Sequence, residues 1–227
     1  MVSHIVITGP GRSGTTLLVQ LLGALGFETG ADRLAFSEQA HAGLESDLLA
    51  DDAPHVVKNP ALTWQLRGLI ESGRLDPASV EWLIVPLRSL SETAASRVKI
   101  AAAQRSVHSH GGLFGTTWPR KQRDWLAGAT YGLFETAAVF ELPLIVLEYP
   151  RFARDAAYAF RRLEPLLRGR SQIDFDSAWR SVVDPTLVRS GPIDVPPFAD
   201  ATLATVRLRD WGKRKFAGAR RRLRGTT

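Results

Sequence analysis

The chain has 227 residues, of which 44% are hydrophobic and 23% are charged, as is ordinary for a globular protein of one domain. The absence of cysteine excludes disulfides, thiolate metal sites and cysteine nucleophiles. The formal net charge is +6, but the residues after Asp210 alone include seven lysines and arginines. We therefore expect one domain over residues 1–210 and a basic tail over residues 211–227.

Hydropathy and the basic tail bear on the cellular location of the protein. The longest apolar run, from Leu17 to Leu25, is interrupted by Gln20 and is far shorter than the roughly 20 residues of a membrane-spanning helix. The apolar N-terminal stretch has no basic leader, so we expect a cytoplasmic protein. The tail could contact an anionic membrane surface, or it could be a solvated C-terminus. We expect no specific nucleic-acid partner.

The first elements of the chain are a strand, a glycine loop and a helix. The run Ile5–Thr8 is typical of a buried parallel strand, and residues 9–14 form a glycine-bearing loop. An apolar helix is expected to begin at Ser13 or Thr15 and to end at Gly26. Strand, loop and helix in this order make a phosphate cradle, because backbone N–H groups converge where the helix N-terminus adds positive charge.

This loop departs from the nucleotide-binding P-loop, G-x-x-x-x-G-K-[ST], at one position. Gly9 and Gly14 have the right spacing and Thr16 fills the hydroxyl position, but Thr15 stands where the lysine should be. That lysine contacts the β- and γ-phosphates in NTPases, and the nearest cation here is Arg12. We expect the loop to hold a phosphate-like group in a reaction other than γ-phosphoryl transfer. The alternative is a tight βα turn whose glycines serve geometry alone.

The rest of the chain alternates short apolar strands with amphipathic helices. Residues 27–42 are expected to form a loop or short helix over the strand edge. The elements that follow are an amphipathic stretch at 43–50, a strand at 54–58, a helix at 61–71, a strand at 81–87, a helix at 89–105, a glycine-rich loop at 106–118, a helix at 119–141, a strand at 142–148 buried on both faces, and a helix at 151–168. This pattern predicts an α/β fold with a doubly wound, mainly parallel sheet and helices on both faces.

Two motifs resemble those of the sulfotransferases that use 3′-phosphoadenosine-5′-phosphosulfate (PAPS) as donor. The run Gly11-Arg12-Ser13-Gly14-Thr15-Thr16 closely resembles their 5′-phosphosulfate loop. Their second signature is an arginine at the end of a later strand with a serine eight residues on, and Arg88 and Ser96 have this spacing. Weaker resemblance to the bacterial enzymes lies in 142–167 and 184–189. The resemblance implies the P-loop, nucleotide-kinase-like sulfotransferase fold.

The resemblance also implies an activity and a set of binding residues. The function would be sulfuryl transfer from PAPS to a hydroxyl of a small molecule, a sugar or a glycolipid, without a metal. The donor would be bound by Gly11, Arg12, Ser13, Gly14, Thr15, Thr16, Arg88 and Ser96. The alternatives are a P-loop kinase of small metabolites and a non-catalytic protein that binds a nucleotide or a membrane surface.

Catalysis needs a cation near the leaving phosphate and a base for the acceptor hydroxyl. Arg12 and Lys58 are the available cations, and the resemblance places Lys58 at the end of the second strand, facing the phosphosulfate. The animal cytosolic enzymes place a histidine base two residues beyond this lysine, where this chain has Pro60. Many bacterial and carbohydrate sulfotransferases instead use a glutamate before the second strand. The candidate bases are Glu45 and Glu38, followed by His41 and His55, and candidate acceptor contacts are Trp64 and Trp118.

Overall fold

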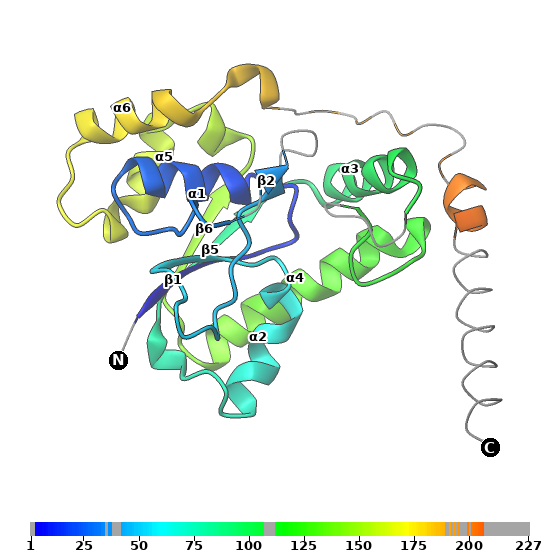
Figure 1. Cartoon of the computed structure of the whole chain (residues 1–227), viewed down its shortest axis with the longest axis horizontal. Helices are drawn as coiled ribbons and strands as arrows, with labels where there is room; N and C mark the ends of the chain where they lie inside the picture. The colour runs from blue at the N-terminus through cyan, green and yellow to red at the C-terminus, as the bar shows by residue number, and fades with distance from the viewer. Residues whose placement is uncertain are drawn as a thin grey trace.

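A four-stranded parallel sheet forms the centre of the computed structural model (Figure 1). The structure describes residues 3–34, 36–37, 42–106, 112–188, 191, 193, 195, 199 and 201–206. Glu38, His41 and the basic tail at 211–227 lie outside these residues. The strands are β1 (His4–Ile7), β4 (Val56–Lys58), β5 (Val80–Leu87) and β6 (Leu144–Glu148), in the spatial order β4-β1-β5-β6.

Side chains alternate between the two faces of the sheet, as the period of a strand requires. In β1, Ile5 and Ile7 belong to one hydrophobic cluster and Val6 to the other. The first cluster is covered by α1 (Thr15–Ala24), α5 (Ala156–Leu163) and α6 (Gln172–Val182). The second is covered by α2 (Leu62–Glu71) and α4 (Gln122–Val139), which lie on the opposite side of the sheet (Figure 1). The predicted α/β architecture, with a parallel sheet flanked by helices, is confirmed.

A third, smaller cluster lies beside the sheet. Helix α3 (Leu90–Ala103) packs on α4 and buries apolar side chains against the segment at 199–206. Ser89 caps the start of α3 by accepting a hydrogen bond from the backbone of Glu92. Within the described ranges, none of the helices combines the length and apolar character needed to cross a bilayer.

The strand order places a crevice at the carboxyl ends of β1 and β5. The chain passes from β1 to β4 on one side, and then crosses β1 to reach β5 on its other side. In open α/β sheets, ligands bind where successive connections run in opposite directions. The residues that leave the sheet at this point are those of the glycine loop after β1 and Arg88 after β5. Both predicted anion-binding motifs therefore border the same crevice.

The structure corrects three local predictions. The strand at 142–148 is not buried on both faces, because among the described residues β6 pairs with β5 alone and Leu144 is 37% exposed. The predicted helix at 151–168 is interrupted, since residues 151–153 form a 3-10 turn and Asp155 caps a separate α5 by accepting from the backbone of Tyr158 at 2.8 Å. Residues 27–42, predicted as a loop or short helix, include β2 (Phe36–Ser37) and the start of β3 (Ala42–Gly43), which pair as antiparallel strands.

Candidate active site

The glycine loop is fastened at its start to the helix that follows β4. The hydroxyl of Thr63, in the first turn of α2, donates to the carbonyl of Gly9 at 2.7 Å and accepts from its N–H at 3.0 Å. The hydroxyl of Thr8 donates to the carbonyl of Asn59 at 2.9 Å. Because Thr8 and Thr63 are both buried, these hydrogen bonds are shielded from water and set the direction in which the loop leaves the sheet.

The loop reaches α1 through several residues with left-handed backbone angles. Gly11, Arg12 and Gly14 have φ values of 65°, 55° and 86°. A Cβ atom at Gly14 would lie 2.6 Å from the ring of Phe152 and 2.9 Å from that of Tyr149, so close packing as well as backbone angle requires glycine. The first N–H groups of α1 have no intrahelical acceptor. The loop and the helix N-terminus together therefore present donors and positive charge to an anion.

Arg88 lies at the edge of this crevice, and only two of its three guanidinium nitrogens have hydrogen-bond partners among the described residues. Its side chain is 5% exposed, and Nε donates to Glu92 at 2.9 Å. Nη1 lies 3.4 Å from the carbonyl oxygen of Arg12, and the guanidinium stands over the ring of Tyr149 at 5.3 Å. Nη2 is buried and has no hydrogen-bond partner among the described residues. A buried N–H group left without an acceptor is costly, and an anion in the crevice would supply one.

Ser96 joins the same group from α3. Its Oγ, in a residue 9% exposed, accepts from Nε of Arg12 at 3.4 Å. Arg12 therefore contacts both members of the predicted pair, Arg88 through its carbonyl and Ser96 through its side chain. In the loop itself, Oγ of Ser13 is buried and lacks a partner within the described structure. Arg12, Arg88 and Ser96 thus lie together. Two buried polar atoms of the predicted donor-binding residues, Nη2 of Arg88 and Oγ of Ser13, have no hydrogen-bond partner among the described residues.

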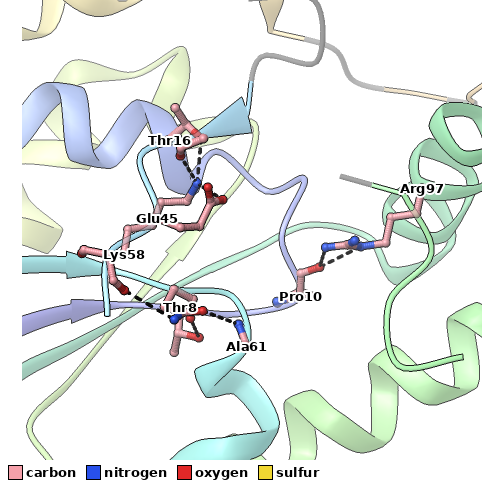
Figure 2. Close-up of polar contacts among 10 residues, drawn as sticks. Thr8, Pro10, Thr16, Glu45, Lys58, Ala61 and Arg97 are labelled. Carbon is pink, nitrogen blue, oxygen red and sulfur yellow. Dashed lines mark hydrogen bonds and ion pairs between the residues drawn. The ribbon is translucent and has the colours of Figure 1, made fainter. Parts of the chain in front are cut away.

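Lys58 supplies a second cation from the end of β4 (Figure 2). Its side chain is 2% exposed, and Nζ donates to Oε1 of Glu45 at 2.8 Å and to Oγ1 of Thr16 at 3.1 Å. It also donates to the carbonyl of Gly43 at 2.5 Å. Burial lowers the pKa of Lys58, and the positive charge of Arg12 acts in the same direction, whereas the hydrogen bond and charge of Glu45 oppose them. An ammonium thus stands at the first turn of α1, where the P-loop lysine is missing.

The other candidates from the sequence lie elsewhere. His55 precedes β4 and is therefore at the amino end of the sheet, where its Nε2 lies 2.9 Å from Glu81. The glycine loop and Arg88 follow the carboxyl ends of β1 and β5, so His55 lies at the opposite end of the sheet from them. Trp64, 41% exposed, packs in an aromatic cluster with Phe114 and Trp125, and Trp118 is 46% exposed.

Two residues of the site were not predicted from the sequence. Tyr149 follows β6 and packs against both Arg88 and Gly14. Its position just after an apolar strand was an available signal, since ligand contacts gather at the carboxyl ends of parallel strands. Arg97 is 4% exposed and bonds to the carbonyl of Pro10 (Figure 2). No motif distinguished it from Lys99, the other cation of α3.

The assembled site favours a ligand with more than one negative charge. Its cationic side chains are those of Arg12, Lys58, Arg88 and Arg97. Glu45 forms an ion pair with Lys58, and Glu92 forms one with Arg88. A scan against protein-family models and searches of curated proteins and of solved structures found no match. The geometry of the site therefore carries the functional conclusion.

Proposed function

We propose that this protein is a sulfotransferase that moves the sulfuryl group of PAPS to a hydroxyl group of a small molecule, a sugar or a glycolipid. The observation that carries the proposal is the meeting of Arg88 and Ser96 at Arg12 in the glycine loop. These three residues come from two motifs far apart in the sequence that resemble the donor-binding elements of one enzyme family. The proposed fold is accordingly the P-loop type used by sulfotransferases.

Two separate places for negative charge support a donor with both a 5′-phosphosulfate and a 3′-phosphate. The loop from Gly11 to Gly14, with Thr15 and Thr16, would hold the 5′ group through backbone N–H groups and the start of α1. Arg88 would hold the 3′-phosphate with the nitrogen that has no partner, and Ser96 would contribute its hydroxyl. The free Oγ of Ser13 provides another donor inside the loop.

The chemical step is the formation of a bond between the acceptor oxygen and sulfur while the bond from sulfur to the 5′-phosphate breaks. Negative charge grows on the leaving phosphate, and the acceptor hydroxyl loses its proton. Lys58, which contacts Thr16 in the first turn of α1, and Arg12, which belongs to the loop itself, would stabilise the leaving charge. Glu45 would accept the proton, with Glu38 as the second candidate.

The position of Lys58 also argues against a small-metabolite kinase. In P-loop kinases the hydroxyl equivalent to that of Thr16 binds Mg²⁺. Here the Thr16 hydroxyl accepts a hydrogen bond from the Lys58 ammonium at 3.1 Å. The ammonium therefore places positive charge beside the hydroxyl that a nucleotide–magnesium complex would need as a ligand. This arrangement suits transfer of a sulfuryl group, which carries less charge than a γ-phosphoryl group.

Binding of adenosine 3′,5′-bisphosphate (PAP), the product that remains after transfer, tests the proposal directly. At 100 times its Kd, PAP should stabilise the fold by about 2.7 kcal/mol. This corresponds to an increase in Tm of roughly 5–10 °C for a chain of this length. ATP with Mg²⁺ is the matched control. No shift with PAP, or an equal shift with ATP, would contradict the assignment, and the second result would favour the kinase.

Transfer is tested by incubating the protein with ³⁵S-labelled PAPS and a metabolite extract. A labelled acceptor product that depends on the protein is the expected result. PAP binding without transfer to acceptors of any class would favour the non-catalytic nucleotide-binding alternative.

A further inference from the structure

Arg97 is a buried residue that contacts the glycine loop with two nitrogen atoms. It belongs to α3, one residue after Ser96, and is 4% exposed. Nε and Nη2 donate to the carbonyl oxygen of Pro10 at 3.1 Å and 2.7 Å (Figure 2). Nη1 donates to the carbonyl of Gly112 at 2.6 Å. All three kinds of guanidinium nitrogen are therefore bonded to backbone carbonyls.

This buried guanidinium has no carboxylate to balance it in the described part of the chain. Its positive charge meets two carbonyl dipoles and the face of the Phe114 ring, whose centroid is 4.5 Å away. Burial, with a smaller contribution from the charge of Arg12, lowers the pKa of Arg97 to about 9, so the side chain remains protonated at neutral pH. An unpaired buried charge is unfavourable for folding, and an apolar side chain of similar size would avoid that cost. We therefore ask what the contact of Arg97 with the Pro10 carbonyl does to the conformation of the glycine loop.

The effect on the loop follows from the planarity of the peptide bond. The carbonyl of Pro10 and the N–H of Gly11 belong to one peptide unit, and in the trans form they point in opposite directions. With the carbonyl held on Arg97, the N–H of Gly11 must point away from Arg97. The backbone also packs directly on the guanidinium, because a Cβ atom at Gly11 would collide with Nη2.

We propose that Arg97 is a positioning residue that holds the glycine loop in its anion-binding form. It keeps the Pro10 carbonyl turned away from the anion, which leaves the N–H of Gly11 turned toward it. The identity of the anion as PAP or PAPS rests on the proposed function, whereas the effect of Arg97 on the loop does not.

The same guanidinium ties the loop to the aromatic cluster of Trp64, Phe114 and Trp125. The backbone N–H and carbonyl of Phe114 are both bonded to the buried side chain of Gln122, at 2.8 Å and 3.0 Å. The Phe114 ring contacts Arg97 on one side and lies edge-on to both tryptophans. A change in the loop that moves Arg97 should therefore change the environment of these indoles, which gives a spectroscopic signal.

The first test compares Arg97→Ala and Arg97→Lys with Lys99→Ala, which removes an exposed cation from the same helix. Hydrogen–deuterium exchange is measured at the amides of residues 11–16 without added ligand, and folding is checked by circular dichroism. We expect faster exchange in the loop of Arg97→Ala, with the strands β1 and β5 unchanged, and wild-type exchange in Lys99→Ala. Unchanged loop exchange in a folded Arg97→Ala protein would overturn the proposal. If the alanine variant does not fold, Arg97→Lys, which keeps the charge but lacks the planar guanidinium with its three bonded nitrogens, is judged by the same criterion.

The second test measures anion binding by calorimetry. PAP affinity should fall roughly 10–100-fold in Arg97→Ala and less in Arg97→Lys, because charge-assisted contacts to the loop are lost. Added guanidinium ion at millimolar concentration should restore part of the affinity of Arg97→Ala and leave Lys99→Ala unaffected, a rescue that a general loss of stability would not show. In the wild type, PAP should change tryptophan fluorescence, and this change should be lost in Arg97→Ala.

The two proposals fail in different ways. If the wild type does not bind PAP, the proposed function is wrong, and the exchange experiment, which needs no ligand, still decides the role of Arg97. If the wild type binds PAP and Arg97→Ala binds it within twofold, the positioning role is wrong and the proposed function stands.

Discussion

Nζ of Lys58 lies 2.8 Å from Oε1 of Glu45, so the cation proposed to stabilise the leaving phosphate neutralises the carboxylate proposed as the base. The lysine is 2% exposed, whereas the side chain of Glu45 is 30% exposed and so can be reached from solvent. An anion bound beside Thr16 would also lie close to the Lys58 ammonium, because Nζ of Lys58 donates to Oγ1 of Thr16 at 3.1 Å.

Replacement of Glu45 by glutamine should therefore lower turnover far more than donor binding. The amide keeps the size of the side chain but cannot accept the proton, so kcat should fall roughly 10²–10⁴-fold. PAP affinity, measured by calorimetry, should change little. Glu38→Gln is assayed beside it with the same acceptor. Near-wild-type turnover in both variants would rule out a carboxylate base at either position.

The lowered pKa of Lys58 predicts how stability depends on pH. Its pKa in the folded state lies below the ordinary 10.5 because burial penalises the charge. Between the lowered value and about 10.5, the unfolded chain binds this proton more tightly, so the contribution of Lys58 to the free energy of unfolding rises with pH. Lys58→Met removes that contribution.

Urea unfolding of wild type and Lys58→Met at a series of pH values from 7 to about 10.5 measures the effect. The difference in unfolding free energy should move in favour of the wild type as the pH increases. Lys99→Met, at an exposed site on α3, should show no such trend. A difference that stays flat or falls with pH would show that the lysine is not destabilised by burial.

Replacement of Arg88 by methionine should separate binding from stability. The variant loses the ion pair with Glu92, whose carboxylate is 23% exposed, but it also removes the buried Nη2 that has no partner. These effects oppose each other, so we expect stability to change by less than about 1 kcal/mol. The increase in Tm caused by PAP should nevertheless disappear, because the 3′-phosphate loses its charge-assisted donor.

Arg67→Met is the matched control for this experiment. Arg67 forms the same i,i+4 ion pair, with Glu71 at 2.7 Å, but on the surface of α2 and away from the crevice. It should retain the full PAP-induced shift. If Arg88→Met also retains it, Arg88 does not bind the 3′-phosphate.

The packing of the loop is tested by comparing Gly14→Ala with Gly73→Ala. Both glycines have positive φ, 86° and 71°, so alanine should cost about 1–2 kcal/mol of backbone strain at either site. At Gly73 no atom lies within 4 Å of the added methyl group, whereas at Gly14 it would meet Phe152 and Tyr149. Overpacking should add roughly 1–3 kcal/mol at Gly14. Equal urea midpoints for the two variants would show that the rings yield without cost.

The elements of the fold that were predictable are those whose signals are local. The β-branched run at Ile5–Thr8, followed by glycines and an apolar stretch, predicted β1, the loop and α1 within a few residues. The position of Arg88 at the carboxyl end of a strand was predictable because it directly follows an apolar run. Hydropathy could not show that β6 lies at the edge of the sheet that the described residues form, since exposure at an edge depends on the order of strands in space.

Two contacts between distant parts of the chain could not be predicted from the sequence: that of Pro10 with Arg97 and that of Lys58 with Glu45. The carbonyl of Pro10 gives no sign that it will accept from Arg97, because any buried donor could reach it. The pairing of Lys58 with Glu45 likewise depends on how the segment after β3 returns to the end of β4. His55 was chosen for its residue type, and the sequence did not show that its place before β4 would put it at the amino end of the sheet, opposite the glycine loop.

The contact of Gly14 with Phe152 has a consequence for synthesis on the ribosome. The glycine motif is translated before Phe152, the residue beyond β6 on whose ring its loop rests. Strand β1 likewise has neighbours on both sides only after β5 has been translated. Because such non-local contacts form slowly, the nascent chain carries the motif without a completed loop until Phe152 is available. Donor binding during synthesis should begin only after Phe152 has left the exit tunnel.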